Sequence, residues 1–138
     1  MDELKDFPIV VSVDVRYRDL DTFNHVNNAV YLTYFEQARV AYFRELGWTS
    51  TDDSVVVARA EVNYRRPIVL GQQLRVGCRV ARFGQKSYVM EYRLLADGKL
   101  AADGATVQAF VSRGKGAPLP EELKQRIRAV EARVGRHL

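Results

Sequence analysis

Cysteine and histidine are scarce in this chain of 138 residues, which has one cysteine, Cys78, and two histidines, His25 and His137. A single cysteine excludes an internal disulfide, and these three side chains form no zinc-binding pattern. No apolar run approaches the roughly 20 residues that a membrane-spanning helix needs. The first six residues also lack the basic and apolar regions of a signal peptide. We therefore expect a cytoplasmic protein that needs no membrane partner and no metal or redox cofactor.

Long runs of basic residues are also missing, although the net charge is +4 and the pI is about 9.4. Scattered basic residues argue against a nucleic-acid-binding protein. Two interpretations of the charge remain: a well-solvated basic surface, or an acidic ligand such as a nucleotide-bearing cofactor or an acidic carrier protein. Hydrophobic residues make up 47% of the chain, which is enough for one core. The length predicts a single domain that spans residues 1–138.

Strands are predicted where apolar and polar residues alternate, because this period of two is typical of half-buried strands. The alternating segments are residues 11–17, 58–64, 74–80 and 88–94. A fifth segment, residues 100–112, is apolar or small on both faces, as in a strand covered on both sides. Asp97-Gly98 before it predicts a tight hairpin turn.

Two helices are predicted, one early in the chain and one at its end. Residues 28–46 contain no proline or glycine, and Gly47 is a typical C-terminal stop. Apolar residues occupy most of the circumference of this helix, so we expect it to be buried on several sides. A second helix should run from Pro120 to about Val134. The chain is therefore predicted to be an α+β domain, with about five antiparallel strands curved around one long central helix.

The most informative segment joins the first strand to the long helix. Residues 19–31 read Asp-Leu-Asp-Thr-Phe-Asn-His-Val-Asn-Asn-Ala-Val-Tyr, and residues 34–39 and 63–68 continue the pattern as Tyr-Phe-Glu-Gln-Ala-Arg and Asn-Tyr-Arg-Arg-Pro-Ile. A carboxylate that faces the free N–H groups of a helix start is a plausible arrangement for attack on a carbonyl. The pattern resembles the 4-hydroxybenzoyl-CoA thioesterase branch of the hot-dog superfamily, over nearly the whole chain.

This resemblance implies a catalytic constellation at the start of the long helix. The family's catalytic acid aligns with Asp21, and the backbone N–H that polarises the thioester carbonyl aligns with Asn28. His25 is a further candidate for catalysis, although a hydrogen bond that braces the loop is the simpler role. Asp19 is expected to be structural, and the side chains of Asn27 and Asn28 are also suited to capping the helix.

Substrate-binding residues are implied more loosely by the same resemblance. Glu36 matches an acid that contacts substrate in relatives that act on aromatic acyl groups, although an ion pair with Arg39, three residues further along the same helix face, is the favoured interpretation. The remaining candidates are aromatic or basic: Tyr31, Tyr64, Arg65, Arg66, Arg82, Lys86 and Arg113. Tyr31 is also compatible with a core position. Cys78 is expected to be a buried, inert thiol.

The predicted function is hydrolysis of a fatty-acyl or aryl-CoA thioester to the free acid and CoA. Asp21 would act as a nucleophile, through a mixed anhydride, or as a general base on water. The resemblance also implies a homodimer or homotetramer with active sites shared between chains. The alternative is a module that binds acyl-CoA or an acyl carrier protein without hydrolysis. The Asp and His spacing of a hot-dog dehydratase is not found.

Overall fold

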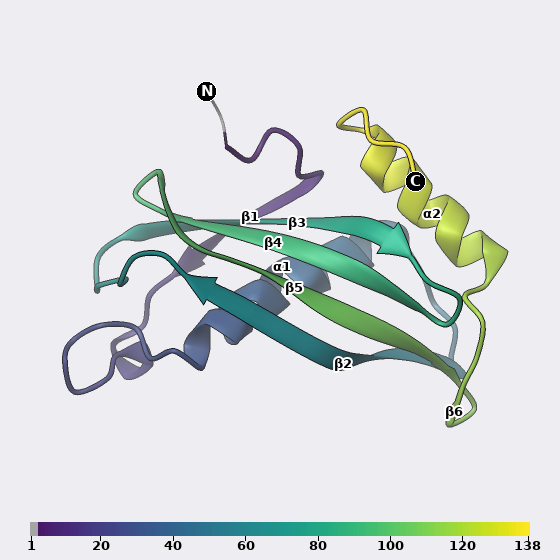
Figure 1. Cartoon of the computed structure of the whole chain (residues 1–138), viewed down its shortest axis with the longest axis horizontal. Helices are drawn as coiled ribbons and strands as arrows, with labels where there is room; N and C mark the ends of the chain where they lie inside the picture. The colour runs from purple at the N-terminus through teal and green to yellow at the C-terminus, as the bar shows by residue number, and fades with distance from the viewer. Residues whose placement is uncertain (1–2) are drawn as a thin grey trace.

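The computed structural model describes residues 3–138, which form one antiparallel sheet and two α-helices (Figure 1). The elements, in order, are β1 (Ile9–Asp14), the 3₁₀ turn η1 (Tyr17–Asp19), α1 (Val30–Leu46), β2 (Asp53–Tyr64), β3 (Gln73–Phe83), β4 (Ser87–Ala96), β5 (Lys99–Ser112), β6 (Lys115–Gly116) and α2 (Glu121–Ala132). The strand order is β1-β3-β4-β5-β2, and the short β6 pairs with β5. Strands β1 and β2 are therefore the two edges of this path.

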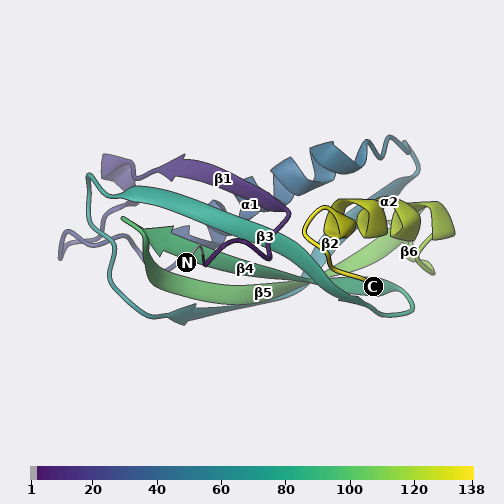
Figure 2. The ribbon, with the colours of Figure 1, turned by 90° about the horizontal axis from the view of Figure 1, so that it is seen from above.

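The sheet curves around α1, which lies along its inner face (Figure 2). One stripe of the helix is buried against the strands: Tyr31, Tyr34, Phe35, Ala38, Tyr42 and Leu46. Phe35 stacks on Tyr92 of β4 with ring centroids 4.6 Å apart. Gly104 of β5 is required beside this ring, because an added Cβ would lie 2.8 Å from Phe35 and would also collide with the Glu61 carbonyl. The close packing of α1 on the sheet thus depends on a residue without a side chain.

The β4–β5 hairpin and the C-terminal end of α1 are formed by the residues that the sequence analysis predicted for them. The hairpin between β4 and β5 is Asp97-Gly98, with φ of 49° and 79°, which is the positive-φ pair of a type I′ turn. Helix α1 ends at Gly47, whose φ of 64° is left-handed. The two helices, the hairpin and the antiparallel order of the sheet are therefore confirmed.

Three expectations were wrong in detail. The first strand ends at Asp14, and Tyr17 lies in the 3₁₀ turn η1 with 81% of its surface exposed. Helix α1 is buried on one side only, since Leu32 and Val40 remain 39% and 43% exposed. Strand β5 is buried on its inner face but only partly covered on its outer face. The apolar composition of α1 and β5 predicted that both would be covered on more than one side, but one chain buries only part of their apolar surface.

The C-terminal helix α2 packs its apolar side, Leu123, Ile127 and Val130, into the same core. Its fully buried Glu131 accepts hydrogen bonds from the Tyr42 hydroxyl at 2.6 Å and the Val80 backbone N–H at 3.0 Å. Arg136 supplies the countercharge at 2.8 Å. One carboxylate thereby joins α2 to both α1 and β3.

Cys78 lies on the buried inner face of β3, with no exposed surface. Burial raises the pKa of its thiol well above the ordinary value. This agrees with the expected inert thiol, because the reactive thiolate is disfavoured in an apolar surrounding.

Candidate active site

The loop between η1 and α1 is held in place mainly by its own backbone. The N–H of Asp21 donates to the His25 carbonyl at 2.7 Å, and the N–H of Asn27 donates to the Asp19 carbonyl at 2.8 Å. The N–H of Val26 reaches the Ile68 carbonyl at 2.8 Å, which fixes the loop to the segment after β2. Asn24 takes a left-handed φ of 64°, a conformation that asparagine tolerates better than most residues. The loop is therefore a closed, braced turn.

Asp19 supports this turn from below, as a structural carboxylate. It is 1% exposed and accepts the Tyr34 hydroxyl at 2.8 Å and the Arg16 side chain at 2.8 Å and 3.0 Å. Burial alone raises the pKa of Asp19, but hydrogen bonds from Arg16 and Tyr34 outweigh it and hold the pKa below its ordinary value. For Tyr34, burial and the bond to Asp19 raise the pKa of the phenol. Asp19 thus remains an acceptor and braces the loop.

Asp21 sits two residues later, and its side chain is only partly buried. Its Oδ1 accepts the N–H of Phe23 at 2.8 Å and the N–H of His25 at 3.3 Å, which is an Asx turn. Within residues 3–138, Oδ2 has no hydrogen-bond partner. One oxygen therefore orients the carboxylate, and the other is available to a reacting molecule. His25 braces the loop through its backbone, in contacts made by its N–H and its carbonyl.

Asn28 presents a backbone N–H that donates to no acceptor in the described part of the chain. Its carbonyl accepts the Tyr64 hydroxyl at 2.9 Å, so the residue is held by β2. Asn27 Oδ1 accepts the N–H of Ala29, the N-cap residue of α1, at 2.9 Å, and no side chain caps the helix from the N-cap position. Of the two asparagine side chains expected to cap the helix, only that of Asn27 therefore bonds to the helix start, and it does so in a turn just before the first helical residue. The open N–H stands at the positive end of α1, where negative charge is stabilised.

A cavity of about 260 Å³ brings these groups together. It is lined by Asp21, His25, Val26, Asn28, Tyr31, Tyr64, Arg65, Arg66 and Pro67. Its aromatic wall is the Tyr31–Tyr64 pair, with ring centroids 4.9 Å apart and planes at 85°. Burial, and then the neighbouring Tyr64, raise the pKa of the Tyr31 phenol. Seven of the predicted site residues, from three separate segments, thus share one cavity.

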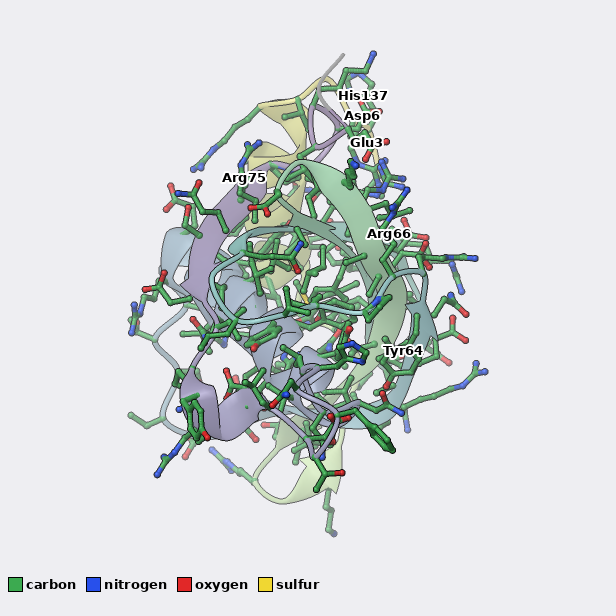
Figure 3. All side chains as sticks on the ribbon, turned by 90° about the vertical axis from the view of Figure 1, so that its left-hand side faces the viewer. Glu3, Asp6, Tyr64, Arg66, Arg75 and His137 are labelled. Atoms are coloured by element: carbon green, nitrogen blue, oxygen red, sulfur yellow. The ribbon has the colours of Figure 1, made fainter. Side chains whose placement is uncertain are left out.

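The predicted basic residues are divided between the two ends of the molecule. Arg65 is held by Asp103 at 3.1 Å, whereas Arg66 forms no ion pair with any described residue. Figure 3 views the molecule from the left-hand side of Figure 1, and there Tyr64 and Arg66 lie on the same side of the molecule. The other three lie at the opposite end of the sheet, near the β3–β4 turn and β6 (Figure 1). Arg82 is close to the end of β3, Lys86 directly precedes β4, and Arg113 directly follows β5. A single chain therefore does not join these three residues to the cavity.

Glu36 borders a second cavity of about 310 Å³, together with Leu32, Thr33, Arg39, Val57, Ala60 and Thr106. Its carboxylate lies 3.8 Å from Arg39, so the expected ion pair is present. Sequence reasoning did not find the Thr106 side of this cavity. A signal existed, because Thr106 and Gln108 interrupt the apolar residues of one strand at alternate positions. Polar residues are mostly exposed, so polar residues at positions expected on the buried face of a strand indicate a structural or functional role.

An antiparallel sheet wrapped around one helix, with a cavity at the helix start, defines the hot-dog class of enzyme fold. The family model of the thioesterase-like superfamily matches residues 15–127. The chain therefore belongs to this superfamily, and it is a thioester hydrolase.

Individual relatives agree with this assignment. A thioesterase from Thermus thermophilus, solved with coenzyme A and zinc, is 46% identical with a TM-score of 0.88, over 96% of this chain and 98% of that one. The uncharacterized Bacillus subtilis (strain 168) protein YsmA is 30% identical over 124 residues, 86% of this chain and 84% of that protein. The long-chain acyl-CoA thioesterase FadM of Escherichia coli (strain K12) is 33% identical over 97 residues, 66% of this chain and 74% of that protein.

Within residues 3–138, no cluster of three or more His, Cys, Asp or Glu side chains is placed to hold a metal ion. In that part of the chain, no helix is long and apolar enough to cross a membrane.

Proposed function

We propose that this chain hydrolyses acyl-CoA thioesters in the Asp21 cavity, with Asp21 and the Asn28 N–H as its catalytic groups. The observation that carries the proposal is their juxtaposition in one cavity: among residues 3–138, one carboxylate oxygen of Asp21 and the backbone N–H of Asn28 have no hydrogen-bond partner. Such a donor stabilises the oxyanion that forms when a carbonyl is attacked. The acyl-CoA substrate is drawn from FadM, named a long-chain acyl-CoA thioesterase, and from the coenzyme A bound to the Thermus relative.

The chemistry has two forms that share this geometry. As a general base, Asp21 takes a proton from water while the water oxygen attacks the carbonyl carbon, and the C–S bond then breaks to release the CoA thiolate, which is protonated. As a nucleophile, Asp21 attacks the carbonyl itself, the thiolate leaves, and water hydrolyses the resulting mixed anhydride. In both forms the carbonyl oxygen carries negative charge next to the Asn28 N–H.

The remaining residues of the cavity position the substrate. Tyr31 and Tyr64 form an apolar wall beside the carbonyl, and the Tyr64 hydroxyl holds Asn28. Arg66, without an ion pair among the described residues, is the basic side chain best placed to meet a CoA phosphate, and Arg65 reinforces it. Arg82, Lys86 and Arg113 would contribute only from another chain or to a remote part of CoA. In this proposal His25 stabilises the loop through its backbone hydrogen bonds to Asp21.

We also propose that the enzyme is a homo-oligomer that pairs along β2. This edge strand is 12 residues long and exposed over most of its length, including Val56 and Val57 at 48% and 45%. A long, apolar edge strand invites pairing with another chain. The exposed side of α1 lies beside the same edge and shares a cavity with β2, so a partner would cover both. Membership of the 4-hydroxybenzoyl-CoA branch and a cytoplasmic location remain predictions.

The deciding experiment is release of the CoA thiol by wild-type and Asp21→Asn proteins across acyl-CoAs of different chain length and aryl-CoAs. Asparagine is neither a competent base nor a comparable nucleophile, so turnover should fall by at least ~10²-fold. The matched control is Asp14→Asn, which changes an exposed aspartate at the end of β1 and should retain full activity. Near-normal turnover by folded Asp21→Asn protein would refute the assignment. Tight acyl-CoA binding without turnover by wild type would favour the binding module instead.

A further inference from the structure

The last residue of β2, Tyr64, joins this edge strand to the start of α1. Its hydroxyl donates to the Asn28 carbonyl at 2.9 Å. Among residues 3–138, no other group donates to that carbonyl, and the Asn28 side chain and N–H make no hydrogen bond. Within the described chain, Tyr64 therefore supplies the one hydrogen bond that directly holds Asn28.

The turn before α1 contains the peptide group that Tyr64 contacts. The N–H of Val30 donates to the Asn27 carbonyl at 2.9 Å, which closes a turn with Asn28 and Ala29 at its centre. The peptide group between these two residues is held at its N–H by Asn27 Oδ1 at 2.9 Å and at its carbonyl by Tyr64. The two bonds oppose rotation of this peptide group, which would change ψ of Asn28 and φ of Ala29.

The proposed oxyanion donor lies on the adjacent peptide group, whose carbonyl is that of Asn27 and whose N–H is that of Asn28. The two peptide groups meet at the Cα of Asn28, so a movement of the carbonyl that Tyr64 holds also moves this N–H. An oxyanion donor must lie about 2.7–3.1 Å from the charge that develops. A misplacement of about 1 Å at a reacting group lowers the rate by about 10²-fold. The rate of the chemical step therefore depends on the contact that holds Asn28.

The ring of Tyr64 is itself fixed from two sides. The N–H groups of the next two residues, Arg65 and Arg66, both donate to the Ala101 carbonyl, at 2.8 Å and 3.1 Å, so β5 anchors the end of β2. From the helix side, the Tyr31 ring packs edge-on against the Tyr64 ring, with centroids 4.9 Å apart. A hydroxyl on a ring held in this way has a defined position relative to the start of α1.

We propose that Tyr64 is a positioning residue for the oxyanion donor: its hydroxyl fixes the place of the Asn28 N–H and thereby raises the rate of the chemical step. This rests on the proposed acyl-CoA hydrolysis. A tyrosine hydroxyl has one proton to donate, and the Asn28 carbonyl accepts it. Tyr64 therefore acts through Asn28 and is not a second donor to the substrate. An interaction that matters only in the transition state changes kcat and leaves KM nearly unchanged.

The test is kcat and KM of Tyr64→Phe, which keeps the ring in the cavity wall and removes the hydroxyl. Tyr64 is 49% exposed, so water replaces the lost bond and the fold should survive. We expect kcat to fall by about 10-fold or more, but by less than the ~10²–10³-fold expected for loss of the donor itself, with KM unchanged.

The matched control is Tyr88→Phe on β4, which removes a hydroxyl that bonds to no described residue and should keep the wild-type kcat. A rise in KM alone in Tyr64→Phe would make Tyr64 a residue that binds substrate, and an unchanged kcat in the folded variant would remove its role in the rate. Either result would overturn the proposal.

A double-variant cycle shows whether Tyr64 acts through Asn28. The donor is absent in Asn28→Pro, so adding Tyr64→Phe to that variant should slow turnover no further. Residues that act as one unit give losses that do not add, whereas independent residues give losses that do. Additive losses would place the effect of the hydroxyl outside the donor and would contradict the proposal.

A second readout does not depend on turnover or on the folding of Asn28→Pro. Octanoyl-CoA labelled with carbon-13 at the thioester carbonyl is bound to Asp21→Asn protein, and the carbonyl resonance is measured by NMR. A hydrogen bond from the Asn28 N–H polarises the carbonyl and moves its resonance downfield. Adding Tyr64→Phe should move the bound resonance back upfield, and adding Tyr88→Phe should leave it in place.

The two readouts separate this proposal from the proposed reaction. A bound resonance that Tyr64→Phe leaves unchanged would overturn the positioning role, even where Asp21→Asn has abolished turnover as expected. Absence of hydrolysis by wild type, with a resonance that responds to Tyr64→Phe, would refute the reaction and retain the positioning of the donor. Absence of any acyl-CoA binding would refute both.

Discussion

At the scale of single residues, the side chain and the backbone of one site residue have different roles. Asn28 is the clearest case, because its side chain makes no cap while its N–H is the proposed oxyanion donor. Asn28→Ala keeps the N–H, so it should change stability by no more than about 0.5 kcal/mol and leave most activity. Asn28→Pro removes the N–H at a position before the first helical turn, where proline is tolerated.

Activity of Asn28→Pro should therefore fall by ~10²–10³-fold, the loss seen when an oxyanion donor is removed. The measurement is kcat on one acyl-CoA for both variants, with circular dichroism spectra to confirm that each is folded. Equal rates for the folded proline and alanine variants would mean that the carbonyl is held elsewhere, and His25 would become the next candidate.

At the scale of secondary-structure elements, α2 depends on one buried carboxylate. Glu131 receives hydrogen bonds from α1 and β3 and pairs with Arg136. Glu131→Ala would leave the Tyr42 hydroxyl and the Arg136 charge without their acceptor, and breaking a buried pair costs about 3–5 kcal/mol. The control on the same helix is Glu122→Ala, which removes an exposed pair with Arg126 and should cost less than about 1 kcal/mol. Urea unfolding of both variants measures the difference, and equal midpoints would contradict it.

The elements themselves were largely predictable, because hairpin turns, helix stops and strand alternation are local properties. Asp97-Gly98 and Gly47 are examples, since each needs only its own backbone preference. The first strand was extended too far, since Tyr17 keeps the period of two while the Arg16–Asp19 hydrogen bonds turn the chain into η1. The Asp21 loop was predicted from its motif. The position of Thr106 in the lining of the second cavity was not predicted, because it depends on which face of β5 meets α1.

At the scale of the whole molecule, the apolar residues of α1 and β2 exceed what one chain buries. If β2 pairs with a second copy, wild type should have at least twice the 15.7 kDa mass of the chain by light scattering at working concentration. Val56→Lys places a charge on the exposed edge strand and should shift the protein towards monomer. Val10→Lys makes the same change on β1, the opposite edge of the sheet, and should leave the mass unchanged. A fully active wild-type monomer would contradict the shared assembly.

The buried position of Cys78 has a practical consequence for all of these experiments. The chain has a single thiol, and no part of that residue is exposed in the fold. A thiol-reactive dye should therefore report released CoA with no background from folded enzyme. In the absence of substrate, the same dye reacts only when the sheet opens. The rate at which the dye labels Cys78 then measures the frequency of that opening for each variant, in the buffer used for the activity assay.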